Sequence, residues 1–271
     1  MSSLALYFLG APRVERDRRP VEFDSRKATA LLAYLAVTGR PHRRDALAAL
    51  LWPESDSPHS RGALRRTLAS IRRAAGHEWL KADQETVGLP GRGSGLWTDV
   101  GRFQGRIAAC RRDGRSGAEV HADALDALEE AVRLYRDDFL AGFSLKDSPE
   151  FDHWQMAEAE RLRAEALVAL ERLVDHHRVH GSWETALAYA RRWLALDRLS
   201  EAAHCRLIEL LAWTGRRGAA LHRHRDFVRA LDDELGIEPL PATVALVEAI
   251  RTGRLSSPAA KPKATPDRCA G

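Results

Sequence analysis

The sequence predicts an α+β winged helix at the N-terminus, followed by an all-α, tetratricopeptide-like helical repeat domain. Three observations lead to this fold class. Strand signals come first and precede three helical segments and a hairpin, the segments beyond about residue 115 have helical periodicity, and positions in the second half recur after 34 residues. A chain of 271 residues with 45% hydrophobic content can bury two cores. We expect a winged-helix domain at 1–97, a helical domain at 98–253 and a disordered Pro/Ala-rich tail at 254–271.

The N-terminal segment begins with strand signals and then changes to a helical pattern. Short strand-like runs separated by turn residues come first, at Leu4–Leu9, Arg13–Arg16 and Pro20–Phe23. From Ser25 the period becomes helical, with apolar residues at Ala28, Leu31, Leu32, Leu35 and Ala36. Ser25 can cap this helix and Gly39 can end it. A second, shorter helix is expected from about Arg43 to Trp52, because Pro53 stops it.

The third predicted helix, Pro58–Gly76, carries the strongest functional signal. Its apolar stripe consists of Leu64, Leu68, Ile71 and Ala75. The opposite face and one flank hold small and cationic residues: Gly62, Arg66, Ala69, Ser70 and Arg73, with Arg61, Arg65 and Arg72 on the flank. Arginine donates to phosphates and guanine edges, and small residues allow close approach, so this face suits the major groove of DNA. The alternative is a solvated, arginine-rich helix without a partner.

A β-hairpin is expected directly after the third helix. Residues 78–82 and 86–89 have strand character, and Asp83-Gln84-Glu85 forms the turn between them. Three helices followed by a hairpin is the order of a winged helix. The glycines at 91, 93 and 95 match no phosphate-binding loop, because no Lys-Ser/Thr follows them and no helix begins there. We therefore expect a turn at this point and no nucleotide or other cofactor.

The second half of the sequence predicts helices and no strands. The expected helices span roughly 118–139, 151–179, 182–196, 200–214, 216–235 and 241–252. Four positions recur after 34 residues, the tetratricopeptide period: Gly181, Ala186, Leu187 and Leu194 return as Gly215, Ala220, Leu221 and Val228. Stacked helix pairs of this kind share a core and leave a surface for protein partners.

Charge is divided unevenly along the chain. Residues 1–115 contain 21 Lys and Arg against 12 Asp and Glu, a net charge of +9, whereas residues 116–271 contain 21 against 26, a net charge of −5. Contact with nucleic acid should therefore be confined to the basic N-terminal part of the chain. The sequence contains neither a long apolar run nor a signal peptide, so we expect a cytoplasmic protein with no membrane partner. Cys110, Cys205 and Cys269 form no C-x-x-C pair, which fits reduced thiols.

The histidines of the second half are the candidate metal cluster. His176 and His180 are four residues apart on a predicted helix that also carries His177, and His222 and His224 follow later. A zinc site of this kind needs an H-E-x-x-H arrangement or a cysteine partner, and the sequence offers neither. We expect packing or surface histidines and no metal. Because no nucleophile, base and oxyanion donor come together in the sequence, we also expect no enzyme.

Several motifs carry a resemblance to one class of bacterial regulators. They are Phe23–Leu35, Arg44–Leu47 with Leu51-Trp52, Arg61–Ala74, Thr98–Phe103, Ala141–Phe143 and Glu234–Pro239. The N-terminal 100 residues resemble the OmpR/PhoB-type winged helix. About residues 4–250 resemble the Streptomyces antibiotic regulatory protein class, in which such a winged helix precedes a bacterial transcriptional activator domain.

This resemblance implies that His59–Ala75 is the recognition helix. DNA contacts fall on Arg66, Thr67, Ala69, Ser70 and Arg72, with Arg61, Arg65 and Arg73 nearby. The sequence departs from the OmpR-type pattern, since Ala69 and Ser70 replace a pair that is often basic, Gly62 replaces another frequent Arg, and the acidic wing tip disfavours DNA contact by the wing. The resemblance also implies recruitment of RNA polymerase by molecules that associate on direct-repeat DNA sites.

The expected function is therefore that of a sequence-specific, double-stranded-DNA-binding transcription regulator, an activator in this class. The alternative is a signalling adaptor whose helical repeats bind a peptide or a regulatory partner. Such an adaptor could stand alone or be a fragment of a larger ATPase-containing regulator.

Overall fold

The computed structural model describes residues 3–91, 94–112 and 122–256. These residues belong to two compact units. Unit 1 comprises residues 1–112 and 129–166, and unit 2 comprises residues 113–128 and 167–271. The units divide the chain at other places than the predicted boundary at residue 97, which stays a prediction. Residues 257–271 of the predicted tail lie outside the described residues.

Unit 1 begins with a four-stranded sheet of order β3-β2-β1-β7. Its strands are β1 (Leu4–Tyr7), β2 (Arg13–Arg16), β3 (Arg19–Pro20) and β7 (Leu96–Thr98). β1 pairs antiparallel with β2, which places Leu6 opposite Val14, and it pairs parallel with β7. Leu4 and Leu6 point to the same face of β1 and are fully buried, as strand alternation requires.

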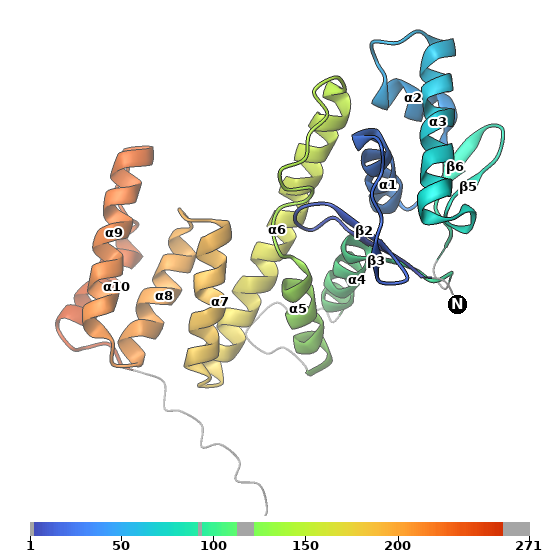
Figure 1. Cartoon of the computed structure of the whole chain (residues 1–271). Coiled ribbons are helices and arrows are strands. Elements are labelled where there is room, and N and C mark those ends of the chain that lie inside the picture. Colours follow the sequence, from blue (N-terminus) through green and yellow to red (C-terminus); the bar gives the residue numbers. More distant parts are fainter. Residues whose placement is uncertain (1–2, 92–93, 113–121, 257–271) are drawn as a thin grey trace, which may run out of the picture. The chain divides into compact units, whose positions relative to one another are not determined.

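The winged helix follows this sheet, as the sequence predicts. It consists of α1 (Arg26–Thr38), β4 (His42–Arg43), α2 (Arg44–Leu51), α3 (Ser57–Ala75), a short 3-10 helix η1 (His77–Trp79), β5 (Lys81–Ala82) and β6 (Thr86–Gly88). Ser25 caps α1 by accepting from the Lys27 N–H, and Gly39 ends it at a φ of +63°. β4 pairs with β6 beside the hairpin β5–β6. Figure 1 shows α2, α3 and this hairpin together in unit 1.

Unit 1 also contains the first part of the helical region, beginning with α4 (Asp99–Arg112), which the sequence reading missed together with β7. Asp99 is 1% exposed and accepts from the backbone N–H groups of Phe8 and Leu9 at 2.9 Å. The Leu140 N–H donates to the Phe8 carbonyl at 2.8 Å. The end of β1 is therefore held by residues about 90 and 130 positions further along the chain.

Two further helices continue the chain, α5 (Ala122–Leu134) and α6 (Pro149–Val179), and each has residues in both units. The predicted helix over 118–139 ends earlier, at Leu134, and Phe139 forms a bridge to Leu9 instead. Its predicted first residues, 118–121, lie outside the described residues. In unit 1 the ring of Trp154, on α6, lies 4.7 Å from that of Tyr34 on α1. This aromatic contact packs α6 against α1 of the winged helix.

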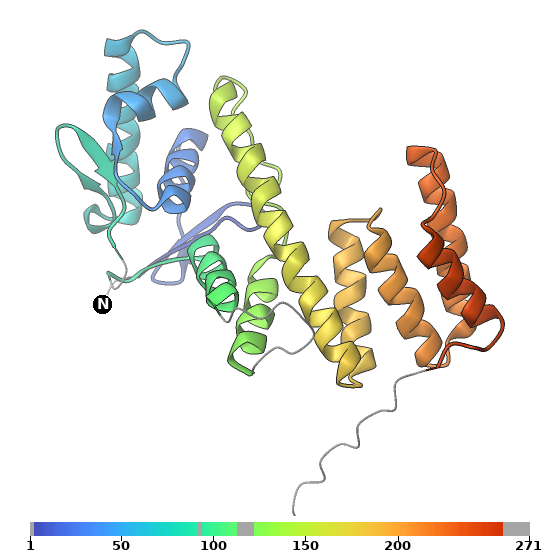
Figure 2. The ribbon, with the colours of Figure 1, turned by 180° about the vertical axis from the view of Figure 1, so that it is seen from behind.

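Unit 2 is helical in every element that the described residues form there. It continues with α7 (Trp183–Leu196), α8 (Glu201–Trp213), α9 (Arg217–Leu235) and α10 (Pro241–Arg251). Figures 1 and 2 show α7, α8 and α9 side by side. Gly181 and Gly215 take the left-handed conformation, at φ of +72° and +79°, before α7 and α9 respectively. Ala186 and Ala220 are both fully buried, so these positions of the 34-residue repeat have the same structural roles.

Candidate DNA interface

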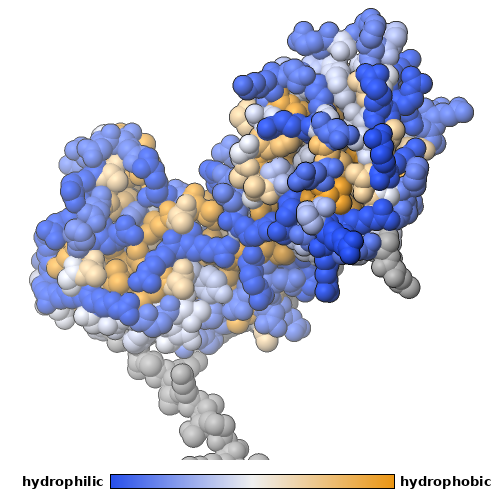
Figure 3. Space-filling view, viewed as in Figure 1, coloured by the Kyte–Doolittle hydropathy of each residue, from blue (hydrophilic) through white to orange (hydrophobic). Residues whose placement is uncertain are grey.

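The local sequence determines where α3 begins, ends and packs. Asp56 caps the helix by accepting from the His59 N–H at 3.0 Å, and Gly76 follows its last residue. Leu64, Leu68 and Ile71 are buried, as the apolar stripe predicts. Between Ser57 and Ala75 there are five arginines and neither Asp nor Glu. The exposed side of α3 is therefore strongly cationic. In Figure 3 the surface of unit 1 over α2, α3 and the hairpin is mostly hydrophilic.

Most of the predicted contact residues lie on this exposed side. Arg61, Arg65, Arg66, Ala69 and Arg73 are exposed, and Ser70 and Arg72 are partly exposed. Thr67 is 7% exposed. It lies three residues after Leu64 and four before Ile71, so it shares the buried stripe of the helix. Thr67 therefore does not lie on the exposed face of α3.

Gly62 is buried as well, contrary to its predicted outward position. A Cβ atom at this glycine would lie 3.6 Å from Nη1 of Arg66. The Arg66 side chain, one turn later on the same helix, thus lies over the glycine and shields it from solvent. The small residue that remains open on α3 is Ala69.

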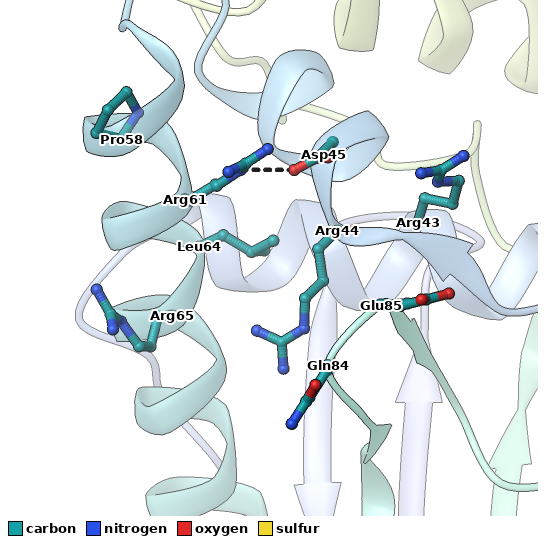
Figure 4. Close-up of a pocket in the computed structure, with 9 residues that line it drawn as sticks. All are labelled: Arg43, Arg44, Asp45, Pro58, Arg61, Leu64, Arg65, Gln84 and Glu85. Carbon is teal, nitrogen blue, oxygen red and sulfur yellow. Dashed lines mark hydrogen bonds and ion pairs between the residues drawn. The ribbon is translucent and has the colours of Figure 1, made fainter.

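A hollow of about 560 Å³ opens between α3, the start of α2 and the wing tip. Figure 4 shows its lining, to which β4, α2, α3 and the turn between β5 and β6 contribute charged side chains. The residues are Arg43, Arg44, Asp45, Pro58, Arg61, Leu64, Arg65, Gln84 and Glu85. Four of these nine residues are arginines, so the hollow suits an anion such as a DNA phosphate. A second hollow further along α3 is lined by Arg44, Arg65, Leu68, Ala69, Arg72, Arg73 and His77.

Arg43 and Arg44 were missed in the sequence reading. Their proximity to α3 depends on how α2 packs against it, and helical periodicity says nothing about such packing. The local signal that could have revealed them is the pair of adjacent arginines at the first turn of a predicted helix.

Hydrogen bonds hold the wing tip against α2. Arg44 donates from its backbone N–H to the Glu85 carbonyl and from Nε to the Asp83 carbonyl, both at 2.8 Å. The Asp83 carboxylate accepts from the backbone N–H groups of Glu85 and Thr86 at 2.8 and 2.7 Å. Hydrogen bonds from Thr86 and Glu85 lower the pKa of Asp83 below its ordinary value. The carboxylate of Asp83 therefore stabilises the turn at the wing tip.

The histidines near the end of α6 and the apolar character of the helices bear on two other kinds of site. Within residues 3–91, 94–112 and 122–256, no three His, Cys, Asp or Glu side chains come together in a way that could hold a metal ion. The rings of His176 and His180 stack at 4.1 Å, and His180 Nδ1 lies 2.8 Å from the His176 carbonyl oxygen. Among the described helices, none combines the length and apolar character that a membrane span requires.

Residues 98–251 match the family model of the bacterial transcriptional activator domain. The chain belongs to this family. The predicted resemblance to the Streptomyces antibiotic regulatory protein class is thereby confirmed. The matched residues begin in β7 and include α4 to α10, so the winged helix lies outside them.

Two known proteins resemble a larger part of the chain. The regulatory protein AfsR of Streptomyces coelicolor is 27% identical over 243 residues, which are 89% of this chain and 24% of AfsR. The structure of Mycobacterium tuberculosis EmbR, solved in complex with a low-affinity phosphopeptide, is similar with a TM-score of 0.65 and 23% identity. That likeness covers 93% of this chain and 66% of EmbR, and it confirms the predicted fold class. The chain thus spans about a quarter of AfsR and about two thirds of EmbR.

Proposed function

We propose that the chain is a sequence-specific DNA-binding transcription regulator, an activator, that acts in the cytoplasm, where bacterial DNA lies. The observation that carries the proposal is the exposed face of α3, which holds five arginines and no carboxylate. This face lies beside a hollow that is also lined by Arg43 of β4 and Arg44 of α2. Such a face suits the major groove of double-stranded DNA, because guanidinium groups donate to both phosphates and guanine edges.

The exposed residues of α3 divide into two groups under this proposal. Arg61, Arg65 and Arg66 lie in the N-terminal half, which in helix-turn-helix proteins reaches the base edges, and Ala69 lets the helix axis approach the groove. Ser70 stands beside Ala69 and adds a hydroxyl. Arg72 and Arg73 at the C-terminal end, with Arg43 of β4 and Arg44 of α2, contact phosphates. Phosphate contacts set the register of the protein on DNA, and base contacts select the sequence. No cofactor and no catalytic step is needed for this function.

The helical repeats supply protein contacts in this proposal. Membership of the activator-domain family supports a role in contacting RNA polymerase, and direct-repeat sites require neighbouring molecules to associate head to tail. Stacked helix pairs such as α7 to α10 offer an extended surface for such contacts.

Selection of duplexes by the full chain from a random-sequence pool tests this proposal, and two substitutions then test the mechanism. Arg66→Ala should weaken binding to the selected duplex by roughly 1–3 kcal/mol and relax discrimination against a scrambled duplex. Arg72→Ala should weaken both duplexes alike and reduce the salt dependence by about one unit. Fluorescence anisotropy at several salt concentrations separates the two effects. Failure to enrich any sequence, with binding to protein partners intact, would favour the adaptor.

A further inference from the structure

Two carboxylates, those of Asp45 and Glu85, line the basic hollow beside α3. Asp45 lies in the first turn of α2, and the hollow that it lines also contains Arg43, Arg44, Arg61 and Arg65. A carboxylate repels the phosphates of DNA, so at this place it reduces the general attraction of the surface for nucleic acid. Asp45 therefore does not serve to raise the affinity of this surface for DNA, and another role must account for it.

Asp45 is paired with one particular arginine of the recognition helix. Its Oδ1 accepts from Nε of Arg61 at 2.7 Å, and Figure 4 shows this contact between α2 and α3. The hydrogen bond from Arg61 also lowers the pKa of Asp45 below its ordinary value, so the pairing favours the charged carboxylate. Because Nε is engaged, the N–H groups on Nη1 and Nη2 of Arg61 stay available to a further acceptor.

We propose that Asp45 is a positioning residue that directs Arg61 to a base edge of DNA, and this inference rests on the proposed function. With Nε held by Asp45, the Nη groups of Arg61 form a fork that matches the O6 and N7 acceptors of guanine. The same carboxylate disfavours contact between Arg61 and a phosphate, since a phosphate would approach Asp45 as well. Asp45 thereby lowers the affinity for DNA of any sequence and increases the difference in affinity between the specific and other sequences, which is what specificity means.

The exposure of the pair agrees with this role. The side chains of Asp45 and Arg61 are 56% and 61% exposed, so in the free protein the pair is open to water and adds little to stability. When DNA covers the surface and displaces water, the charges interact more strongly. Asp45 should therefore influence DNA binding far more than folding.

Glu85 provides a matched control within the same hollow. It lines the hollow from the wing tip, and its carboxylate takes part in none of the ion pairs found among the described residues. Glu85→Gln removes the same charge as Asp45→Asn without touching Arg61. The two variants therefore separate an effect of net charge from an effect of positioning.

The experiment measures binding of full-length variants to the duplex selected by the parent chain and to a scrambled duplex. Asp45→Asn should tighten binding to the scrambled duplex a few-fold and reduce the ratio of specific to scrambled affinity by about five- to tenfold, within the range of one bidentate guanine contact. Glu85→Gln should tighten binding to both duplexes equally and leave the ratio unchanged. In an Arg61→Ala background, Asp45→Asn should have no further effect on the ratio.

Three results would overturn the inference: an unchanged ratio in Asp45→Asn, an equal fall in Glu85→Gln, or an effect of Asp45→Asn that persists without Arg61. In each case the parent still discriminates between the duplexes, so the proposed function stands. If the parent chain selects no sequence, both the function and the inference fail. Thermal unfolding of each variant checks that the fold is retained.

Discussion

The helices α3 and α9 both have 19 residues and both are rich in arginine, yet they carry different net charges. α3 holds five arginines and no acidic residue, whereas α9 holds four arginines together with Asp226, Asp232, Asp233 and Glu234. With histidines neutral, α3 thus has a net charge of +5 and α9 a net charge of zero. An arginine count alone would not tell the two helices apart.

The two helices also differ in how their arginines are paired. In α9, Arg229 pairs with Asp226 at 2.5 Å and Arg217 donates to the backbone carbonyl of Arg251, while Arg223 and Arg225 take part in none of the ion pairs found among the described residues. In α3, Arg61 has an ion pair, and the other four arginines of the helix take part in none of the pairs found there. Unpaired guanidinium groups are thus more frequent on α3, and no carboxylate on the same helix opposes a polyanion.

Charge reversal should produce the largest separation between the two helices. We expect Arg65→Glu/Arg66→Glu in α3 to weaken DNA binding by about 100-fold or more, because two attractive contacts become repulsive. The matched change in α9, Arg225→Glu/Arg229→Glu, should leave DNA affinity within about twofold, since a partly neutralised helix offers little to a phosphate. Gel shift of the full-length variants measures both effects, with circular dichroism as the control for folding. Equal losses in the two variants would remove the distinction drawn between the helices.

Acid should affect the attachment of α9, which depends on a neutral histidine. His204 on α8 is 4% exposed, its ring stacks on Phe227 of α9 at 4.0 Å, and Nε2 donates to the Arg198 carbonyl. Burial lowers the pKa of His204 from its ordinary value of 6.5. Below pH 6.5 the unfolded chain therefore takes up a proton that the folded chain does not, and the free energy of unfolding falls as the pH drops.

The variant His204→Leu should lower stability at neutral pH by about 1 kcal/mol, through loss of the hydrogen bond, and should flatten the fall in stability on acidification. Thermal unfolding at pH 7 and pH 5 measures both changes. A residual slope is expected, because burial also lowers the pKa of His42 in unit 1. His222→Gln, on the exposed face of α9, is the control. An unaltered slope in His204→Leu would show that the packing of α9 does not depend on this neutral ring.

Each helix also contains one glycine, and here the expected effects are smallest. Gly62→Ala should raise the free energy of unfolding by about 0.5–1 kcal/mol, because alanine has the higher helix propensity and the nearest neighbour of its Cβ is the end of the flexible Arg66 side chain. Gly218→Ala, in the first turn of α9, should stabilise the chain by less. DNA affinity should stay constant in both variants, because a Cβ atom 3.6 Å from Nη1 of Arg66 makes an ordinary van der Waals contact and leaves Arg66 in place. Chemical denaturation and anisotropy measure these changes, and a loss of affinity in Gly62→Ala would show that the position of Arg66 depends on the bare glycine.

Local signals predicted much of the fold. Ser25 and Gly39 delimit α1, and Gly76 ends α3, because capping depends on neighbours within a few residues. β7 was not predicted, since Leu96–Thr98 is only three residues long and its partner β1 is about 90 residues away. A local sequence pattern does not predict which two strands pair when they are that far apart in the chain.

For the candidate site too, the sequence predicted what lies within one helix and not what depends on contacts between helices. Periodicity placed Arg61, Arg65 and Arg66 on the exposed side of α3, because all three lie on one helix. It could not place Arg44 or Asp45 beside them, since that proximity arises from the packing of α2 on α3. It also erred at Gly62, where the covering group is a long side chain of the same helix.

The way in which the end of β1 is held has a consequence for anyone who wishes to graft this DNA-reading module onto another protein. A cut at residue 97 or 100 would remove Phe139 and Leu140, which bind the end of β1, and Trp154, which packs on Tyr34. It would also remove Ser148, whose hydroxyl donates to the Leu51 carbonyl at the end of α2. The smallest transplantable piece therefore extends to about residue 166, where unit 1 ends within α6. A chimera designed from the order of motifs along the chain would leave part of the donor's interior behind.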